Sequence, residues 1–305
     1  MKSSFSTPCR LCGSEKFRPL FEKNNFQIVA CTGCGIVFVA NPPAPRELQA
    51  IYVEEYYRGS GSSVGTVDFI KDKAFFDTIG REKADYVRRF AGTAPRTLLD
   101  IGCGMGCFLG AMKAAGWTVE GIEVSAYAAD YVAKNLGIPV RCGTVEQFPA
   151  DREKSFDVIT LWDVLEHVPD PARLLRHCRR LLKPGGCFFL STTNIDTPFF
   201  KLFGKQARIV IPPSHLYYFS IPVLKKLLAD NSLEMIDFCH EPLFVNGDRL
   251  WRRCEKMWPV LQRLHLSERW PCLQWGFHIN PRDSLRLAAR DGRWSSQPSA
   301  DPPGA

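Results

Sequence analysis

The sequence predicts an α/β protein in which helices cover both faces of a mostly parallel sheet, with a small cysteine-rich module in front of it. Three observations lead to this prediction. Between residues 97 and 193, short apolar runs alternate with helical patterns, as strands joined by crossover helices do. A glycine-rich turn joins the first of these runs to its helix. The segment before residue 41 is rich in cysteine and turn residues, and a proline-rich stretch at 41–45 then breaks the chain.

Composition narrows the class of protein. The chain has 305 residues, of which 45% are hydrophobic and 23% charged, the profile of a globular protein with a full core. No apolar run approaches the ~20 residues that span a bilayer, and the N-terminus lacks a secretory signal, so we expect a cytoplasmic protein. In that reducing setting the 12 cysteines indicate metal ligation and buried thiols rather than disulfides. Much of the +7 net charge comes from arginines after residue 245 and is typical of a solvated surface.

The expected elements follow in chain order. Before the sheet we expect helices at 46–57 and 71–90, separated by a flexible loop at 59–63. The alternating region predicts strands at 97–101, 117–123, 138–142, 156–162 and 187–193. Its helices are expected at 105–115, from the N-cap Ser125 to Gly137, and from Asp170-Pro171 to a turn at 183–186. After Ser220 we expect a helix, a strand at 233–239, a helix at 249–266 and a strand at 284–288, then a disordered end.

The turn after the first strand carries most of the functional information. Residues 98–106 read LLDIGCGMG, a buried strand that runs into three alternate glycines, Gly102, Gly104 and Gly106. Glycine is needed where the backbone turns sharply and where a ligand lies against it. Glu123 ends the next strand, where its carboxylate can accept hydrogen bonds from two ribose hydroxyls.

Two classes of cofactor use such a turn. A dinucleotide needs G-x-G-x-x-G, yet position 107 holds cysteine, and the carboxylate of Asp100 would repel a pyrophosphate. S-adenosylmethionine has no phosphate, and its sulfonium and amino groups are cationic, so a nearby acid favours it. The turn therefore favours a methyltransferase over a dehydrogenase.

Three segments resemble the successive motifs of class I S-adenosylmethionine-dependent methyltransferases. They read LLDIGCGMGCFL at 98–109, FDVITLWDVLEHVPDP at 156–171 and LLKPGG at 181–186. Over about residues 75–240 the chain is most similar to the branch that contains the ubiquinone-biosynthesis O-methyltransferases. The resemblance implies a Rossmann-like sheet of seven strands with a reversed last hairpin. It also implies cofactor contacts, from Asp100, Gly102, Gly104 and Gly106 at the methionine and ribose end, Glu123 at the ribose, and Thr144, Val145 and Glu146 at the adenine.

The cysteine-rich module predicts a structural zinc site. Cys9-x-x-Cys12 and Cys31-x-x-Cys34 are separated by 18 residues, long enough for a short hairpin, and each pair is followed by a glycine. Four thiolates complete the tetrahedral coordination of one zinc ion and leave no open position for catalysis. Because the module has few basic and several aromatic residues, we expect it to pack on the catalytic domain as one wall of the substrate site, and we do not expect it to bind nucleic acid.

The loop after the fourth strand holds the first candidates for catalysis. Asp163, Glu166 and His167 follow that strand, and His167 is a candidate general base. In the ubiquinone-type relatives an acid–x–x–Glu–His arrangement at this position is associated with a divalent metal, which would lower the pKa of an acceptor hydroxyl, and these three residues match it. The alternative is that Glu166 and His167 only cap and orient the loop.

The connection before the next helix supplies further candidates. In the family this segment covers the acceptor pocket, so His215, followed by Tyr217 and Tyr218, is expected either to serve the acceptor or to pack the loop. Asn194, at the tip of the fifth strand, is another pocket candidate. Trp162 is expected to fill the core, with stacking on adenine as the alternative.

These features predict four parts: a zinc ribbon at 1–45, a helical linker and cofactor-site lid at 46–92, a methyltransferase domain at 93–292 and a disordered tail at 293–305. The predicted function is S-adenosylmethionine-dependent methylation of a small-molecule or glycan acceptor, most readily at oxygen. One alternative is an RNA methyltransferase that grips its substrate with the zinc module and the C-terminal arginines. Another is a binding module that holds the cofactor without turnover.

Overall fold

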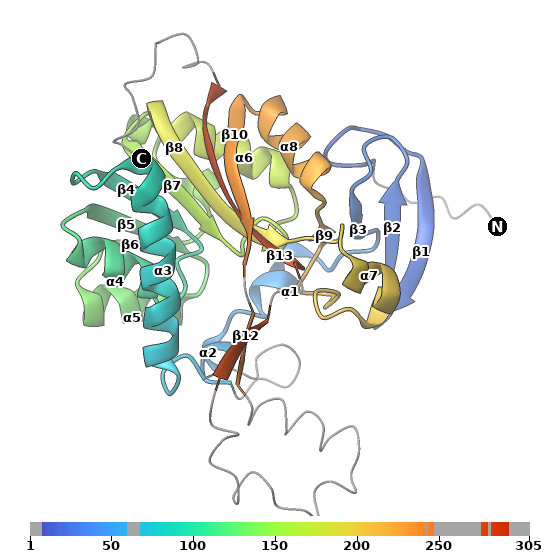
Figure 1. Cartoon of the computed structure of the whole chain (residues 1–305), viewed down its shortest axis with the longest axis horizontal. Helices are drawn as coiled ribbons and strands as arrows, with labels where there is room; N and C mark the ends of the chain where they lie inside the picture. The colour runs from blue at the N-terminus through green and yellow to red at the C-terminus, as the bar shows by residue number, and fades with distance from the viewer. Residues whose placement is uncertain (1–7, 60–67, 242, 247–275, 280–281, 293–305) are drawn as a thin grey trace, which may run out of the picture.

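The computed structural model describes residues 8–59, 68–241, 243–246, 276–279 and 282–292 (Figure 1). Its centre is a seven-stranded sheet in the order β10-β13-β8-β7-β4-β5-β6. The neighbouring strands from β4 to β8 are parallel, whereas β13 runs antiparallel to both β8 and β10. The predicted seven-stranded sheet with a reversed last hairpin is therefore confirmed.

The elements of this part of the chain lie close to their expected positions. The strands are β4 (Thr97–Ile101), β5 (Thr118–Glu123), β6 (Val140–Cys142), β7 (Phe156–Trp162), β8 (Leu182–Thr193), β10 (Leu233–His240) and β13 (Ser284–Asp291). The longer helices are α3 (Lys73–Ala91), α4 (Cys107–Ala114), α5 (Ala126–Leu136), α6 (Pro171–Leu181) and α8 (Ile221–Asp230). Short 3-10 turns follow β6 as η1 (Val145–Gln147) and η2 (Ala150–Arg152).

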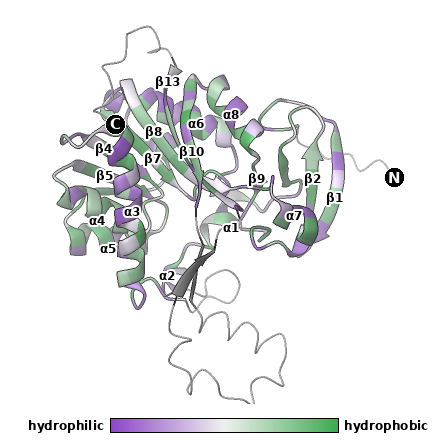
Figure 2. Ribbon diagram, viewed as in Figure 1, coloured by the Kyte–Doolittle hydropathy of each residue, from purple (hydrophilic) through white to green (hydrophobic). Residues whose placement is uncertain are grey.

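Two hydrophobic cores lie on the two faces of the sheet. Alternate residues of a strand point to opposite faces, so Leu98 packs with α3, α4 and α5, whereas its neighbour Leu99 packs with α6 and α8. Figure 2 shows hydrophobic residues along the central strands, whereas α3 carries both hydrophilic and hydrophobic residues along its length. The burial of both faces explains why these strands are continuous apolar runs in the sequence.

Local signals set several helix ends. Ser125 caps α5 by accepting a hydrogen bond from the amide of Ala128, and Gly137 ends that helix in a left-handed conformation with a φ of 57°. Asp170 accepts from the amide of Arg173 at the start of α6. The helix expected from residue 105 begins only at Cys107, because the residue before it, Gly106, still has a left-handed φ of 76°.

Two predictions about local structure were wrong. The helix expected at 46–57 is two short helices, α1 (Pro45–Gln49) and α2 (Glu54–Tyr57), because the chain turns between them. The turn expected at 183–186 does end α6, but these residues already form the start of β8, where Leu182 pairs with Phe156. The predicted helix at 249–266 and the tail at 293–305 lie outside the described residues, as does most of the loop at 59–63.

The cysteine-rich module forms a second sheet that includes a strand from the catalytic part of the chain. Its own strands are β1 (Phe17–Lys23), β2 (Phe26–Cys31) and β3 (Val37–Val39), and the β1–β2 hairpin confirms the expected one. The fourth strand is β9 (Tyr217–Tyr218), which pairs with β3. Helix α7 (Pro198–Phe203) and turn η3 (Gly204–Gln206) lie beside this sheet in Figure 1. The module is thus continuous with the connection that precedes α8.

A third, two-stranded sheet pairs β11 (Leu243–Asn246) with β12 (Gly276–Ile279) and extends the last hairpin beyond β10 and β13. None of the helices that the structure describes is long and apolar enough to cross a bilayer.

Candidate active site

A cavity of about 800 Å³ lies at the carboxyl ends of β4, β5 and β7. This edge of a parallel sheet is where α/β proteins bind their ligands. The walls come from the lid segment between α1 and α3, from the glycine turn after β4, and from the loops after β5, β6 and β7. The cavity brings together most of the predicted site residues, namely Asp100, Gly102, Gly104, Gly106, Glu123, Thr144, Val145, Glu146, Asp163 and His167.

Glu123 is fixed by the backbone around it. Its carboxylate accepts hydrogen bonds from the amide of Gly104 at 2.8 Å and from the amide of Ser125 at 2.9 Å. Gly104 has a φ of 51°, and a Cβ there would meet no atom closer than the Tyr57 ring at 4.0 Å, so the glycine leaves its side toward the cavity open. Burial raises the pKa of Glu123, an effect that the amides of Ser125 and Gly104 oppose. Two turns of the chain therefore hold one carboxylate in a set orientation.

Asp100 lies at the end of β4 beneath the glycine turn. Thr160 donates a hydrogen bond of 2.6 Å to its carboxylate. The side chain is almost fully buried, and burial raises the pKa of Asp100 to about 7. A cationic ligand in the cavity would stabilise the ionised form.

The turn after β6 forms a further wall of the cavity. Thr144 precedes η1, Val145 is buried, and Glu146 is exposed. Asp170 and Leu174 of the α6 segment complete the wall there. The adenine contacts expected from Thr144, Val145 and Glu146 stay predictions.

Lys83 is a charged residue of this cavity that the sequence analysis missed. It lies on α3 and is buried, and its ammonium is 3.3 Å from the carboxylate of Asp163 and 4.9 Å from the centre of the Trp162 ring. Burial lowers the pKa of Lys83, but the charges of Asp163 and Glu241, together with the hydrogen bond to Asp163, outweigh burial, so the pKa lies above its ordinary value. The sequence did contain an indication of this role. Lys83 is a charged residue on the face of α3 that also buries Gly80 and Val87, and a charge on a buried helix face needs a partner.

Asp163 is oriented toward the cavity by an unusual backbone conformation. Its φ is 57°, rare for a residue other than glycine, and its side chain is 53% exposed, to the cavity that it lines. Protein surrounds that cavity, so burial raises the pKa of Asp163, but Lys83 and a hydrogen bond from Ser191 outweigh burial and bring the pKa below its ordinary value. The cavity thus has one fixed cation and one fixed anion side by side.

His167 faces the cavity from the loop after β7. Its Nδ1 lies 2.8 Å from the carbonyl oxygen of Ser214, which can only accept, so Nδ1 donates and Nε2 carries the free lone pair. Burial lowers the pKa of His167, so the neutral ring persists below its ordinary titration range. Tyr52 of the lid packs edge-to-face on this ring at 6.2 Å between ring centres.

Glu166 and His215 lie outside the walls of the cavity, beside His167. The rings of His167 and His215 are 4.8 Å apart, and Nδ1 of His215 donates to the carbonyl oxygen of Ile209 at 2.8 Å. Burial raises the pKa of Glu166 to about 8, and Thr192 donates to its carboxylate at 2.8 Å. Of the two roles expected for His215, these contacts favour packing of the loop, since its ring lies against that of His167 and it does not line the cavity.

The arrangement Asp163-x-x-Glu166-His167 does not come together as one set of metal ligands. Asp163 is engaged by Lys83, whereas Glu166, His167 and His215 each offer one ligand atom, all within 4.8 Å of one another. Two imidazoles and a buried carboxylate are suitable ligands for a divalent transition ion. Among the described residues, the set that fits such an ion has His215 in the place expected for Asp163.

Four further candidates are structural. Asn194 is fully buried and donates to the carbonyl oxygen of Arg282, so it is no pocket residue. Tyr217 and Tyr218 form β9, and their hydroxyls donate to backbone carbonyls, which removes them from the acceptor site. Trp162 lines the cavity but packs in the core edge-to-face on Phe108, as expected.

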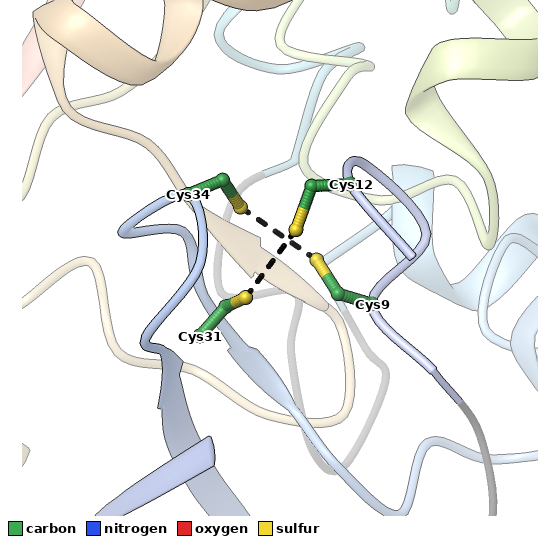
Figure 3. Close-up of side chains that lie close together, drawn as sticks. All are labelled: Cys9, Cys12, Cys31 and Cys34. Atoms are coloured by element: carbon green, nitrogen blue, oxygen red, sulfur yellow. Dashed lines mark hydrogen bonds between the residues drawn. The ribbon is translucent and has the colours of Figure 1, made fainter. Parts of the chain in front are cut away.

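The four cysteines of the module gather at one point, as Figure 3 shows. The sulfur atoms of Cys9 and Cys34 are 3.7 Å apart, and those of Cys12 and Cys31 are 3.5 Å apart. Four sulfurs each about 2.3 Å from a tetrahedral zinc ion would be about 3.8 Å apart. The geometry of the donor atoms therefore fits one zinc ion.

Fold and cavity together define a class of protein. Residues 75–237, more than half of the chain, match the family model described as a methyltransferase domain. The chain belongs to this family and is a class I S-adenosylmethionine-dependent methyltransferase.

Particular relatives narrow the comparison. The ubiquinone biosynthesis O-methyltransferase of Pseudomonas paraeruginosa is 38% identical over 117 residues, which are 37% of this chain and 50% of that protein. The enzyme of the same name from Actinobacillus pleuropneumoniae is 39% identical over 122 residues, 37% of this chain and 52% of that protein. The chain thus spans about half the length of these relatives.

A solved structure shows the same fold. The 1,6-didemethyltoxoflavin-N1-methyltransferase of Burkholderia thailandensis, with 1,6-didemethyltoxoflavin and S-adenosylhomocysteine bound, superimposes with a TM-score of 0.51 at 18% identity. The superposition covers 90% of this chain and 99% of that one. At this identity the likeness extends to the fold alone.

Proposed function

We propose that the protein transfers the methyl group of S-adenosylmethionine to a hydroxyl oxygen of a small-molecule acceptor. The observation that carries the proposal is one continuous cavity that joins the glycine turn and Glu123 at one end to His167 at the other. The relatives named as ubiquinone biosynthesis O-methyltransferases support oxygen as the methylated atom.

The cofactor would lie along the carboxyl ends of the strands. Glu123 would bind the ribose, and the turn that begins with Thr144 would bind the adenine. Lys83 would bind the carboxylate of the methionine moiety, and Asp163 its ammonium group, so that the fixed pair of charges matches the zwitterion. The sulfonium would then lie close to Asp100.

The acceptor would enter between the cofactor and His167. Methyl transfer is an in-line displacement at the sulfonium methyl, so the acceptor oxygen must approach opposite the sulfur and lose its proton. Nε2 of neutral His167 would take that proton, while the carbonyl of Ser214 holds the ring in orientation through Nδ1. Asp163 would stabilise the imidazolium that forms.

The walls of this end of the cavity favour a flat, weakly polar acceptor. They are rich in apolar and aromatic side chains from the lid and α3, namely Leu48, Tyr52, Tyr56, Phe69, Phe76 and Ile79. Aromatic walls stack on planar rings, whereas a sugar needs several hydrogen-bond partners. We therefore favour a phenol-like acceptor over the glycan that the sequence left open. The cytoplasmic location and the absence of nucleic-acid binding stay predictions.

Two metal sites belong to this proposal. Cys9, Cys12, Cys31 and Cys34 would hold a structural zinc ion that stabilises the module. As an alternative to the role of His167 as a general base, Glu166, His167 and His215 would be the ligands of a divalent ion, because the one lone pair on Nε2 of His167 cannot serve both purposes. Such an ion, when bound, would supply a Lewis acid that lowers the pKa of an acceptor hydroxyl.

A screen of acceptors tests the proposal. The protein would be incubated with S-adenosylmethionine and matched panels of phenols, catechols and monosaccharides, and release of S-adenosylhomocysteine would be measured. We expect turnover with a phenolic acceptor, and His167→Gln should lower kcat by about 10²–10⁴-fold while cofactor affinity changes little. His177→Gln, on α6 and away from the cavity, is the control. Full turnover by His167→Gln would remove His167 from the proposed role, and turnover with sugars alone would overturn the acceptor class.

A further inference from the structure

The carboxylate of Glu123 has most of its hydrogen-bonding positions filled before any cofactor arrives. A carboxylate offers about four acceptor positions, two on each oxygen. Ser125 and the hydroxyl of Tyr57 donate to Oε1, at 2.9 Å and 3.3 Å, and Gly104 donates to Oε2 at 2.8 Å. Among the described residues these three hydrogen bonds leave one position, on Oε2, although the amide of Val124 also stabilises the ionised carboxylate. A ribose has two adjacent hydroxyls, so Glu123 in this arrangement can bind only one of them directly.

Tyr57 comes from the lid and is anchored there by aromatic contacts. It is the last residue of the short helix α2, and only 4% of its surface is exposed. Its ring lies 5.5 Å from that of Phe69 and 6.2 Å from that of Tyr127 on α5, and its carbonyl accepts from the amide of Phe69 at 2.9 Å. A movement of the Tyr57 hydroxyl therefore requires a movement of the surrounding lid.

The hydroxyl of Tyr57 has a free acceptor position of its own. A phenolic hydroxyl donates one hydrogen bond, which here goes to Glu123, and its oxygen can accept another. Burial raises the pKa of Tyr57, so the hydroxyl keeps its proton and its role as a donor. The ring also lines the cavity beside Gly104, on the side where the glycine leaves room for a ligand.

We propose that Tyr57 completes the ribose site of the cofactor. One ribose hydroxyl donates to the free position on Oε2 of Glu123. The other donates to the Tyr57 hydroxyl, which itself donates a hydrogen bond to Oε1. This inference rests on the proposed binding of S-adenosylmethionine. It makes Tyr57, at the end of α2, a part of the cofactor site.

Calorimetric titration of S-adenosylhomocysteine tests this inference, with Tyr57→Phe as the variant. Tyr57→Phe keeps the ring and its packing but removes the hydroxyl, and loss of one neutral hydrogen bond should weaken binding by about three- to tenfold. Tyr131→Phe is the matched control, because Tyr131 on α5 packs against the same aromatic cluster as Tyr57 but does not line the cavity. We expect its affinity to equal that of the wild type.

A second pair of ligands shows whether the effect comes from the ribose. Adenosine and 2′,3′-dideoxyadenosine would be compared on both proteins, and the weakening caused by Tyr57→Phe should occur with adenosine and vanish with the dideoxy compound. Unchanged or tighter binding of S-adenosylhomocysteine by Tyr57→Phe, or equal weakening with both nucleosides, would overturn the inference while leaving the proposed function intact. No binding of S-adenosylhomocysteine by the wild type would overturn the proposed function and this inference with it.

Discussion

The two ends of the cavity are built in different ways. At the cofactor end, Glu123 is held by the amides of Gly104 and Ser125, in the turns that directly follow β4 and β5. At the acceptor end, His167 is held by Ser214, which belongs to a distant connection. That connection is held in turn by the cysteine-rich module, since the amide of Val39 donates to the carbonyl of Leu216 at 2.9 Å and β3 pairs with β9.

The hairpin of the module reaches the same connection a second time. The ammonium of Lys23 donates to the carbonyl of Val210 at 2.5 Å, and the side-chain amide of Asn24 donates to the carbonyl of Pro212 at 3.3 Å. The cofactor end thus depends on local backbone geometry, whereas the acceptor end depends on a folded module far away in the sequence. Unfolding of the module should therefore impair the acceptor end and leave the cofactor end intact.

Loss of the zinc ion should give the largest effect. Cys12 is exposed, so Cys12→Ser removes a ligand without opening a hole in the core. We expect the region 8–39 to lose its protection from hydrogen exchange and methyl transfer to fall by more than about tenfold, because an unfolded module cannot hold the Ser214 segment. Binding of S-adenosylmethionine should stay within about threefold of the wild type, since its contacts are local.

Cys239→Ser is the control for this experiment, because Cys239 is an exposed thiol on β10 away from the four-cysteine cluster. Zinc content, exchange, binding and turnover should all match the wild type. Normal turnover in a zinc-free Cys12→Ser protein would show that the module does not position the acceptor end.

A smaller effect is expected from pH at the cofactor end. The pKa of Asp100 is about 7, so this carboxyl is protonated at lower pH and ionised at higher pH. The cationic cofactor prefers the ionised form, so its affinity should rise between about pH 6 and pH 8, by roughly tenfold for each unit by which binding lowers the pKa. Titrations of the wild type and Asp100→Asn at several pH values check this, and the variant should show a flat profile.

The affinity for the cofactor should rise with pH, whereas the stability of the cofactor-free protein should fall with pH. Because folding raises the pKa of Asp100 above its ordinary value of 3.8, its contribution is present below that value and is lost as pH rises through about 7. Asp100→Asn should therefore lessen the fall in melting temperature between about pH 4 and pH 7. The same slope in the variant would assign the titration to another group, of which Glu123 is the nearest candidate.

The contrast between the two ends also explains what the sequence could predict. The succession of strands and helices along the chain, the glycine turn and the position of Glu123 were predicted because each depends on neighbouring residues. The clustering of the four cysteines was predicted because each Cys-x-x-Cys pair lies within one short turn of the chain. The sequence left open whether His215 serves the acceptor or packs the loop, because its orientation is set by the carbonyl of Ile209 and by the sheet that β9 shares with β3, neither of which leaves a local pattern.

Ion pairs and hydrogen bonds between elements far apart in the sequence were the hardest features to predict. Lys83 and Asp163 are 80 positions apart and meet only because α3 packs over the end of β7. The hydrogen bond from Tyr57 to Glu123 depends in the same way on the lid, whose predicted single helix proved to be two. Charge and aromatic residues in these segments were visible in the sequence, but their partners depended on tertiary packing.

Calorimetric titration of S-adenosylmethionine into the wild type and into Glu123→Ala tests the central claim most directly, with NADH as the competing class of cofactor. We predict a Kd on the order of micromolar for the wild type, no binding of NADH, and loss of binding in Glu123→Ala, because the variant removes the carboxylate to which the two turns are joined. Failure of the wild type to bind S-adenosylmethionine, or equal binding by Glu123→Ala, would contradict the account.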